Sequence, residues 1–228
     1  VHANEEIGTV QPIADIAALC RREGVLIHTD ASQSLGKLPV GVGELDIDLM
    51  SLSGHKAYGP KGVGALYVRR GVGLEPQVWG DGHEWGQRAG MPNVAGLVGY
   101  GAVVGLADAN RQEAVPRIAG LRKRLADRLL SQVNESRVYG PADEQRLAGT
   151  LCIALPGVPA GDLLAAAPEL CATALACGSP DGQATLSTTL RAIEADPAEA
   201  IGAIRLSVGW YTNEEEIDTA ADALIGAW

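Results

Sequence analysis

Apolar and polar positions near the start of the chain alternate between helical and strand spacing. Apolar side chains recur every three or four residues over residues 12–22, with proline at the first position, where it is tolerated, so we expect a helix there. Gly24 ends this helix, and residues 25–30 form an apolar run typical of a buried strand. Two more short β-prone runs cover residues 48–53 and 63–68. This order predicts a mainly parallel sheet with ligand groups at the strand ends.

The next segment combines a long loop with a long helix. Residues 79–93 are rich in glycine and mixed in polarity, and long irregular segments inside compact proteins are more often functional than idle. Residues 93–132 have helical character, and we expect the helix to break near residues 114–116, where proline occurs.

A second region with both strand and helix signals follows. Strand-like runs cover residues 150–155, 171–176 and 203–208. The last helix begins after Asn213, which can cap it, and Glu216 completes a pattern resembling a capping box. We therefore expect an α+β region at the carboxyl end of the chain.

Composition narrows the classes of function. The 228 residues are 46% apolar and 20% charged, which allows a sizeable core built from Leu, Val, Ile and Ala. The net charge of −10 argues against a nucleic-acid partner, because phosphates bind to clustered Lys and Arg. We expect no membrane association, since no apolar run is long enough for a membrane helix and no signal peptide is visible. The cysteines show neither metal-ligand spacing nor a dense disulfide pattern, so we expect no metal site and a reduced, cytoplasmic setting.

Candidate chemistry is concentrated at two expected strand ends. Asp30 ends one strand with Gln33 close behind, and Lys56 follows another strand. Enzymes that use pyridoxal 5'-phosphate (PLP) need such a pair: a lysine that carries the cofactor covalently, and a carboxylate that keeps the pyridine nitrogen protonated. Ser53 and His55, just before the lysine, can donate hydrogen bonds to a phosphate.

These residues also have ordinary structural interpretations. Most lysines are solvated surface groups, and Asp30 is placed to cap a following helix. His28 lies on the same strand face as Asp30, and we interpret it as a packing residue. Lys56 differs from a typical surface lysine because small and polar residues precede it at the end of a strand. Asp30 and Gln33 lie at the end of another strand.

Several runs of sequence carry a resemblance to a known family. They are His2-Ala3-Asn4-Glu5-Glu6-Ile7-Gly8-Thr9-Val10-Gln11-Pro12-Ile13, His28-Thr29-Asp30-Ala31-Ser32-Gln33, Asp48-Leu49-Met50-Ser51-Leu52-Ser53-Gly54-His55-Lys56 with its continuation over residues 58–68, and residues 204–209 and 212–218. The chain resembles the cysteine desulfurases, PLP enzymes of the class-V aminotransferase group within the fold-type I superfamily. The resemblance implies an α/β fold: residues 1–112 as the carboxyl-terminal part of the large PLP-binding domain, and residues 113–228 as a small α+β domain.

The resemblance also implies roles for the residues at the strand ends. Lys56 corresponds to the lysine that binds PLP, and Asp30 to the partner of the pyridine nitrogen. Gln33 would contact the ring hydroxyl, while Ser53 and His55 would contact the phosphate.

Two further residues gain roles in the same way. Arg205 would hold the carboxylate of an amino-acid substrate, a task suited to a planar guanidinium group, although a strand-end surface charge is the alternative. In the family, a cysteine on a mobile loop attacks the substrate sulfur, which leaves a persulfide on the enzyme and releases alanine; Cys177 stands at that position. We expect the other three cysteines, Cys20, Cys152 and Cys171, to lie in the core.

The departures from the family pattern leave alternatives open. The family has a long segment before the position of His2, so we expect a homodimer or a complex with a chain that carries that portion, with a sulfur-acceptor protein as a further partner. Glu5 and Met91 stand where the family usually has other residues near the cofactor. The leading interpretation is a PLP-dependent enzyme that cleaves the C–S bond of cysteine or a related amino acid. The alternatives are a specialised PLP lyase, or other chemistry at Cα or Cβ in secondary metabolism, one subunit of a split enzyme, or a non-enzymatic subunit.

Overall fold

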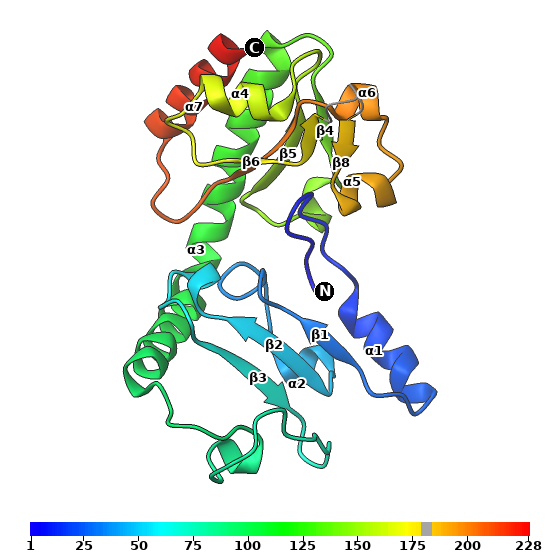
Figure 1. The fold of residues 1–228 in the computed structure, drawn as a ribbon, viewed down its shortest axis with the longest axis vertical. Helices are drawn as coiled ribbons and strands as arrows, with labels where there is room; N and C mark the ends of the chain where they lie inside the picture. The colour runs from blue at the N-terminus through cyan, green and yellow to red at the C-terminus, as the bar shows by residue number, and fades with distance from the viewer. Residues whose placement is uncertain (179–183) are drawn as a thin grey trace. The chain divides into compact units, whose positions relative to one another are not determined.

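The structure, a computed structural model, describes residues 1–178 and 184–228 and divides into two compact units. The first unit holds Val1–Ala3 and Gln11–Arg111, and the second holds Asn4–Val10 and Gln112–Trp228. The long helix α3 (Val94–Gln132) contributes residues to both (Figure 1). Among the described residues, no helix has the length and apolar character needed to cross a membrane.

The first unit contains a three-stranded sheet in the order β1-β2-β3 (Figure 1). Strands β1 and β2 are parallel, as expected, with Asp30 opposite Ser51, whereas β3 is antiparallel to β2. The elements of this unit before α3 are α1 (Ile13–Arg22), β1 (His28–Asp30), α2 (Val42–Leu45), β2 (Leu49–Ser53), the 3₁₀ helix η1 (His55–Ala57), β3 (Gly64–Val68) and the 3₁₀ helix η2 (Glu84–Gly86).

Helix α1 forms where the apolar spacing predicted it. Ile13 and Ala17 are buried one turn apart, and Gly24, with φ of +67°, follows the helix in a conformation that suits glycine. The strand after it is shorter than expected. Val25 and Leu26 are exposed, and β1 begins only at His28, so the prediction of a buried strand over residues 25–30 was wrong for its first half.

Helix α3 does not break where proline occurs, so the expected interruption at residues 114–116 was wrong. The helix runs through Pro116. A proline removes one N–H donor, which leaves the carbonyl of Gln112 without its usual partner. Both Gln112 and Pro116 are exposed, so water can bond to that carbonyl. Burial of Ile118 and Leu121 in the following turn holds the helix in place.

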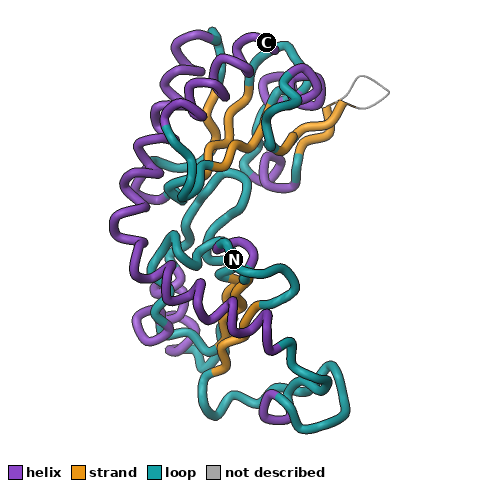
Figure 2. Tube along the Cα trace, turned by 90° about the vertical axis from the view of Figure 1, so that its left-hand side faces the viewer, coloured by secondary structure: helices purple, strands orange, loops and turns teal. Residues whose placement is uncertain are grey.

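The second unit is the α+β region that the sequence predicted. Its main sheet has the order β4-β5-β9-β6 and is antiparallel throughout, and β7 and β8 form a separate antiparallel hairpin (Figure 2, orange). The elements are β4 (Arg137–Tyr139), the 3₁₀ helix η3 (Asp143–Gln145), β5 (Thr150–Ala154), α4 (Ala160–Ala166), β6 (Thr173–Ala174), β7 (Ala176–Gly178), β8 (Ala184–Leu186), α5 (Thr188–Ala192), α6 (Pro197–Ala200), β9 (Ala203–Ser207) and α7 (Glu214–Ala227). The single strand expected over residues 171–176 is therefore two short strands, β6 and the start of β7.

The two faces of this sheet pack against different elements. On β5 and β9, Leu151 and Ile204 belong to one apolar cluster, which includes side chains of α3, α4 and α7. Cys152 and Ala203, one position away on the same strands, belong to a second cluster with side chains of β7, β8 and α5. Alternation along the strands thus assigns each side chain to a face.

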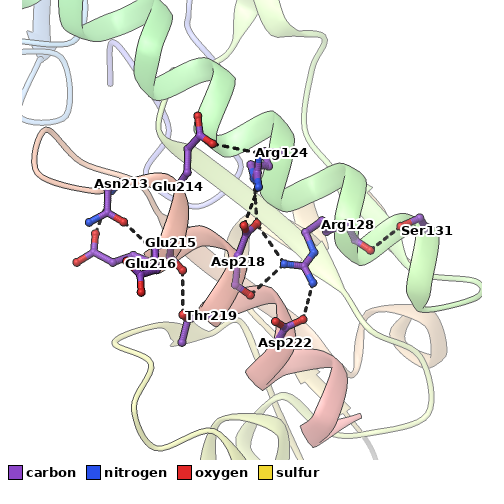
Figure 3. Close-up of polar contacts among 10 residues, drawn as sticks. All are labelled: Arg124, Arg128, Ser131, Asn213, Glu214, Glu215, Glu216, Asp218, Thr219 and Asp222. Carbon is purple, nitrogen blue, oxygen red and sulfur yellow. Dashed lines mark hydrogen bonds and ion pairs between the residues drawn. The ribbon is translucent and has the colours of Figure 1, made fainter.

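Helix α7 is fixed at its start and along its side. Asn213 and Glu216 form the predicted capping box. Further along, Asp218 accepts two hydrogen bonds from Arg124 of α3, with N–O distances of 2.9 and 2.6 Å, and pairs with Arg128 at 3.1 Å; Asp222 pairs with Arg128 (Figure 3). The hydrogen bonds from Arg124 lower the pKa of Asp218 to about 2.

We expect Asp218→Asn to lower the unfolding temperature of the full-length protein slightly at neutral pH, because exposed ion pairs contribute little individually but networks contribute more. A carboxylate with a lowered pKa stabilises the fold fully above its unfolded pKa of about 3.9 and loses this contribution as the pH falls towards about 2. Thermal unfolding at several pH values should therefore show the variant and the wild type converging between about pH 4 and pH 2. A stability difference that stayed constant down to about pH 2 would contradict the contribution of these ion pairs.

Candidate functional site

Asp30 lies at the carboxyl end of β1, in the first unit, and is exposed. Its Oδ1 accepts a hydrogen bond from the backbone N–H of Ser32 at 2.8 Å. Burial raises the pKa of Asp30, but the hydrogen bonds from Ser32 and the positive charge of Lys56 outweigh it, so the net shift is downward. The carboxylate is therefore ionised at neutral pH, the state required to pair with a protonated ring nitrogen.

Lys56 lies in η1, immediately after β2, the parallel neighbour of β1. The carboxyl ends of adjacent parallel strands meet at one edge of a sheet, so the chain brings Lys56 and Asp30 to the same edge. The effect of the lysine charge on the pKa of Asp30 agrees with this placement. Gln33, in the turn after β1, accepts a hydrogen bond from Lys37 Nζ at 3.3 Å.

The turn between β2 and η1 carries the two residues expected to contact a phosphate. Ser53 Oγ and His55 Nδ1 lie 3.1 Å apart. Gly54 between them is buried against backbone: a Cβ atom there would lie 3.0 Å from the carbonyl oxygen of Val63 and 3.1 Å from the ring of Tyr100. The close approach of Val63 and Tyr100 thus favours glycine at this position, and the hydroxyl and imidazole groups flank it on either side.

His28 differs from the packing residue that we expected. Along β1, His28 and Asp30 are exposed and Thr29 is buried, so the shared face of the first two residues is confirmed. The side chain of His28 is exposed rather than packed, and its Nε2 lies 2.8 Å from Ser51 Oγ on β2. Polar residues alternate along both strands, with His28 and Asp30 on β1 and Ser51 and Ser53 on β2. This spacing indicates a polar face, on which His28 and Ser51 form a pair.

Arg205 lies in the middle of β9, in the second unit, with Cys152 and Thr173 as its neighbours on the flanking strands. Its Nη2 donates to Thr173 Oγ1 at 3.0 Å, and its Nη1 donates to the backbone oxygen of Glu5 at 3.5 Å. The buried Nε has no hydrogen-bond partner among the described residues. The guanidinium group is therefore held in place with hydrogen-bonding capacity left, as a site for a carboxylate needs.

Cys177 is exposed and lies in β7 of the hairpin, with Thr185 of β8 as its Cα partner. It therefore occupies a hydrogen-bonded strand, next to the segment 179–183 that lies outside the described residues. Its neighbours Ala176 and Leu186, themselves a cross-strand pair, are buried in the second cluster of this unit. The alternation of the strands leaves Cys177 on the outer face.

The remaining cysteines divide between core and surface. Cys152 is buried, and burial raises the pKa of its thiol to about 12, so it is inert as a nucleophile at neutral pH. Cys20 is half-buried against the apolar cluster of the first unit. Cys171 is exposed, so its expected place in the core was wrong: it precedes β6 in a loop rather than lying in a strand.

A set of polar side chains that meet in the second unit was not predicted from the sequence. Asn4 and Glu6 contact Thr189 and Ser187, respectively. Ser187 also caps α5, a position that its residue type favours, but no local pattern indicates that residues so far apart in the chain meet.

The residues of the first unit fit PLP. An ionised carboxylate and a lysine reach one sheet edge, and a hydroxyl and an imidazole flank a glycine turn where the backbone is tightly packed. These donors match a pyridine nitrogen, an aldehyde and a phosphate. Lys56, Asp30, Gln33, Ser53 and His55 would hold the group.

Comparisons with known proteins agree with this chemistry. The profile of the family described as aminotransferase class-V matches residues 1–219. The cysteine desulfurase IscS of Histophilus somni (strain 2336) is 45% identical over 222 residues, which cover 96% of this chain and 54% of that protein. The IscS of Shewanella amazonensis is 42% identical over 231 residues, covering all of this chain and 56% of that protein. The chain thus spans about half the length of the curated relatives that it matches.

Solved structures show the same likeness. A NifS-like protein superposes with a TM-score of 0.87 at 32% identity, covering 99% of this chain and 59% of that one. DndA from Streptomyces lividans superposes with a TM-score of 0.71 at 30% identity, covering 90% of this chain and 58% of that one. These matches confirm the expected fold class and the PLP chemistry of the family. They do not favour the specialised chemistry that Glu5 and Met91 suggested.

Proposed function

The chain belongs to the class-V aminotransferase family, and from this premise we propose that it works in a PLP-dependent cysteine desulfurase, which transfers the sulfur of L-cysteine to Cys177 and leaves alanine. The observation that carries the proposal is the placement of Asp30 and Lys56 at the carboxyl ends of two adjacent parallel strands. Bound PLP supplies an electron sink that weakens bonds at the α and β carbons of an amino acid.

Each residue has a distinct task in this proposal. Lys56 would hold the cofactor and would move protons to and from the substrate carbon atoms. Asp30 would keep a proton on the pyridine nitrogen, and Ser53 and His55 would bind the phosphate. Arg205 binds the substrate carboxylate through the donors that its contacts with Thr173 and Glu5 leave available.

Cys177 is the sulfur acceptor. Its Sγ, as the thiolate, attacks the substrate sulfur: the new S–S bond forms while the bond between sulfur and the β carbon breaks. The electron pair of the broken bond stays with the β carbon, which takes up a proton, so the products are a persulfide on Cys177 and alanine. Exposure of Cys177 supports this task, since the persulfide must also be accessible to a receiving thiol.

The proposed enzyme also needs partner chains and a reducing setting. The site would be completed in a homodimer, or with a chain portion corresponding to the half of the relatives that this chain does not cover. A sulfur-acceptor protein would take the persulfide sulfur. Four free cysteines support a reducing, cytoplasmic setting.

Product analysis tests the proposed function. The full-length protein, loaded with PLP and given L-cysteine without a reductant, should form alanine and protein-bound persulfide in a ratio of about one to one in the first turnover. Excess dithiothreitol should then release the sulfur as sulfide and restart alanine formation. Formation of pyruvate and ammonia in place of alanine would contradict the proposal.

A further inference from the structure

Residues 4–10, here called the amino-terminal strap, are fixed within the second unit by their backbone. Leu147 donates its N–H to the oxygen of Gly8, and Val10 donates its own to the oxygen of Gln145, each at 2.8 Å. The side chain of Ile7 lies in the same apolar cluster as Ala176 and Leu186. The strap therefore packs beneath the hairpin that carries Cys177.

The base of that hairpin is tied to the main sheet. Leu175, just before β7, donates its N–H to the oxygen of Ala203 on β9, and Ser187, just after β8, donates to the oxygen of Leu175, both at 2.8 Å. With Cys177 opposite Thr185 in register, the orientation of the outer face follows from how Leu175 and Ser187 are held.

Two side-chain hydrogen bonds join the strap to Ser187 and to the start of α5. Ser187 Oγ donates to Glu6 Oε2 at 2.5 Å, and Asn4 Nδ2 donates to Thr189 Oγ1 at 3.3 Å. Asn4 is itself held, because its Oδ1 accepts from the backbone N–H groups of Glu6 and Ile7 at 2.9 Å. The bond to Glu6 is the stronger of the two, since its acceptor is a carboxylate.

The same strap also contacts the proposed substrate-binding residue. The backbone oxygen of Glu5 accepts from Arg205 Nη1, and Arg205 lies on the sheet face that the strap and the hairpin share. Glu5 thus contacts Arg205, and the next residue, Glu6, contacts Ser187 at the base of the Cys177 hairpin. An arrangement of this kind fixes the nucleophile relative to the group that would orient the substrate.

We propose that Glu6, through its hydrogen bond with Ser187, is a positioning residue for Cys177, and that the strap sets the approach of the thiol to the sulfur of a substrate held by Arg205. This proposal rests on the proposed function. Glu6 touches neither substrate nor cofactor in it. Because misplacement by about 1 Å can cost up to about a hundredfold in rate, loss of the bond should slow sulfur transfer without weakening substrate binding.

Variants of Ser187 separate the bond to Glu6 from the capping of α5. Ser187→Asp keeps a good cap, since aspartate is favoured there, but cannot donate to Glu6 at neutral pH and repels it. Ser187→Thr keeps both the cap and the donor. In the full-length holoenzyme we expect Ser187→Asp to form persulfide on Cys177 at least about tenfold more slowly in a single turnover, with unchanged cysteine affinity and PLP content, and Ser187→Thr to stay within about twofold of the wild type. Glu6→Ala should match Ser187→Asp, and Glu6→Gln, which keeps an acceptor, should recover part of the rate.

Hydrogen exchange gives a readout that does not depend on activity. The amides of Leu175 and Ser187 should exchange faster in Ser187→Asp and Glu6→Ala than in the wild type and Ser187→Thr. Faster exchange in Ser187→Asp with a wild-type rate of persulfide formation would overturn the positioning role. Unchanged exchange would show that the hydrogen bond between Glu6 and Ser187 does not hold the hairpin. Failure of the proposed function looks different: the unaltered enzyme would then form no persulfide on Cys177, while the exchange comparison would still decide whether the strap holds the hairpin.

Discussion

Lys56→Ala in the full-length protein is expected to abolish the conversion of cysteine to alanine, with a loss of at least about 10³-fold, because the residue both holds the cofactor and moves protons. PLP should still bind weakly through Asp30, Ser53 and His55, but it should be removed by dialysis. The measurement is alanine formation under saturating PLP and cysteine, with absorbance of lysine-bound PLP followed in parallel.

Lys61→Ala is the matched control for this substitution. Lys61 is exposed and lies five residues further along, in the turn directly after Pro60. Its loss should leave both the absorbance and the rate within about twofold of the wild type, since isolated surface charges contribute little. If Lys61→Ala removed the absorbance and Lys56→Ala kept it, the assignment of the cofactor lysine would be wrong.

Cys177→Ser should have the second large effect. The hydroxyl keeps the size of the side chain but is not a nucleophile at neutral pH, so we expect persulfide formation to vanish and alanine formation to fall by about 10³-fold, while cysteine still binds. Persulfide is measured by mass spectrometry of the intact protein after one turnover without reductant.

Cys171→Ser controls for the loss of an exposed thiol. Cys171 is exposed like Cys177 but lies before β6, outside the hairpin. The substitution should leave persulfide and alanine formation unchanged. A Cys177→Ser enzyme that still released sulfide at the wild-type rate would point to simple C–S cleavage, without transfer to the protein.

Sequence patterns predicted the parts of this molecule that depend on local spacing. Residues a few positions apart in the chain were enough to predict four features. These are helix α1, the capping box of Asn213 and Glu216, and the strands β2 and β5. The placement of Asp30 and Lys56 at one sheet edge was predictable, because neighbouring parallel strands bring their carboxyl ends to the same edge.

Features that depend on distant contacts were not predictable in the same way. Pro116 suggested an interruption of the helix, but burial of the turns that follow it keeps α3 continuous. Cys171 lies in an apolar run that suggested a buried strand. It is exposed because β6 begins only at Thr173. The contact between Glu6 and Ser187 joins residues 181 positions apart, and neither side chain differs locally from an ordinary surface or capping residue.

The central claim is that the sheet edge of the first unit holds PLP on Lys56. The most direct measurement is peptide mass spectrometry of the full-length protein after reduction with borohydride, which fixes the cofactor to the lysine that carries it. We expect a single phosphopyridoxyl adduct, on the peptide that contains Lys56, at close to one per chain, and its loss in Lys56→Ala. An adduct on another lysine, or none in protein purified with PLP, would contradict the account.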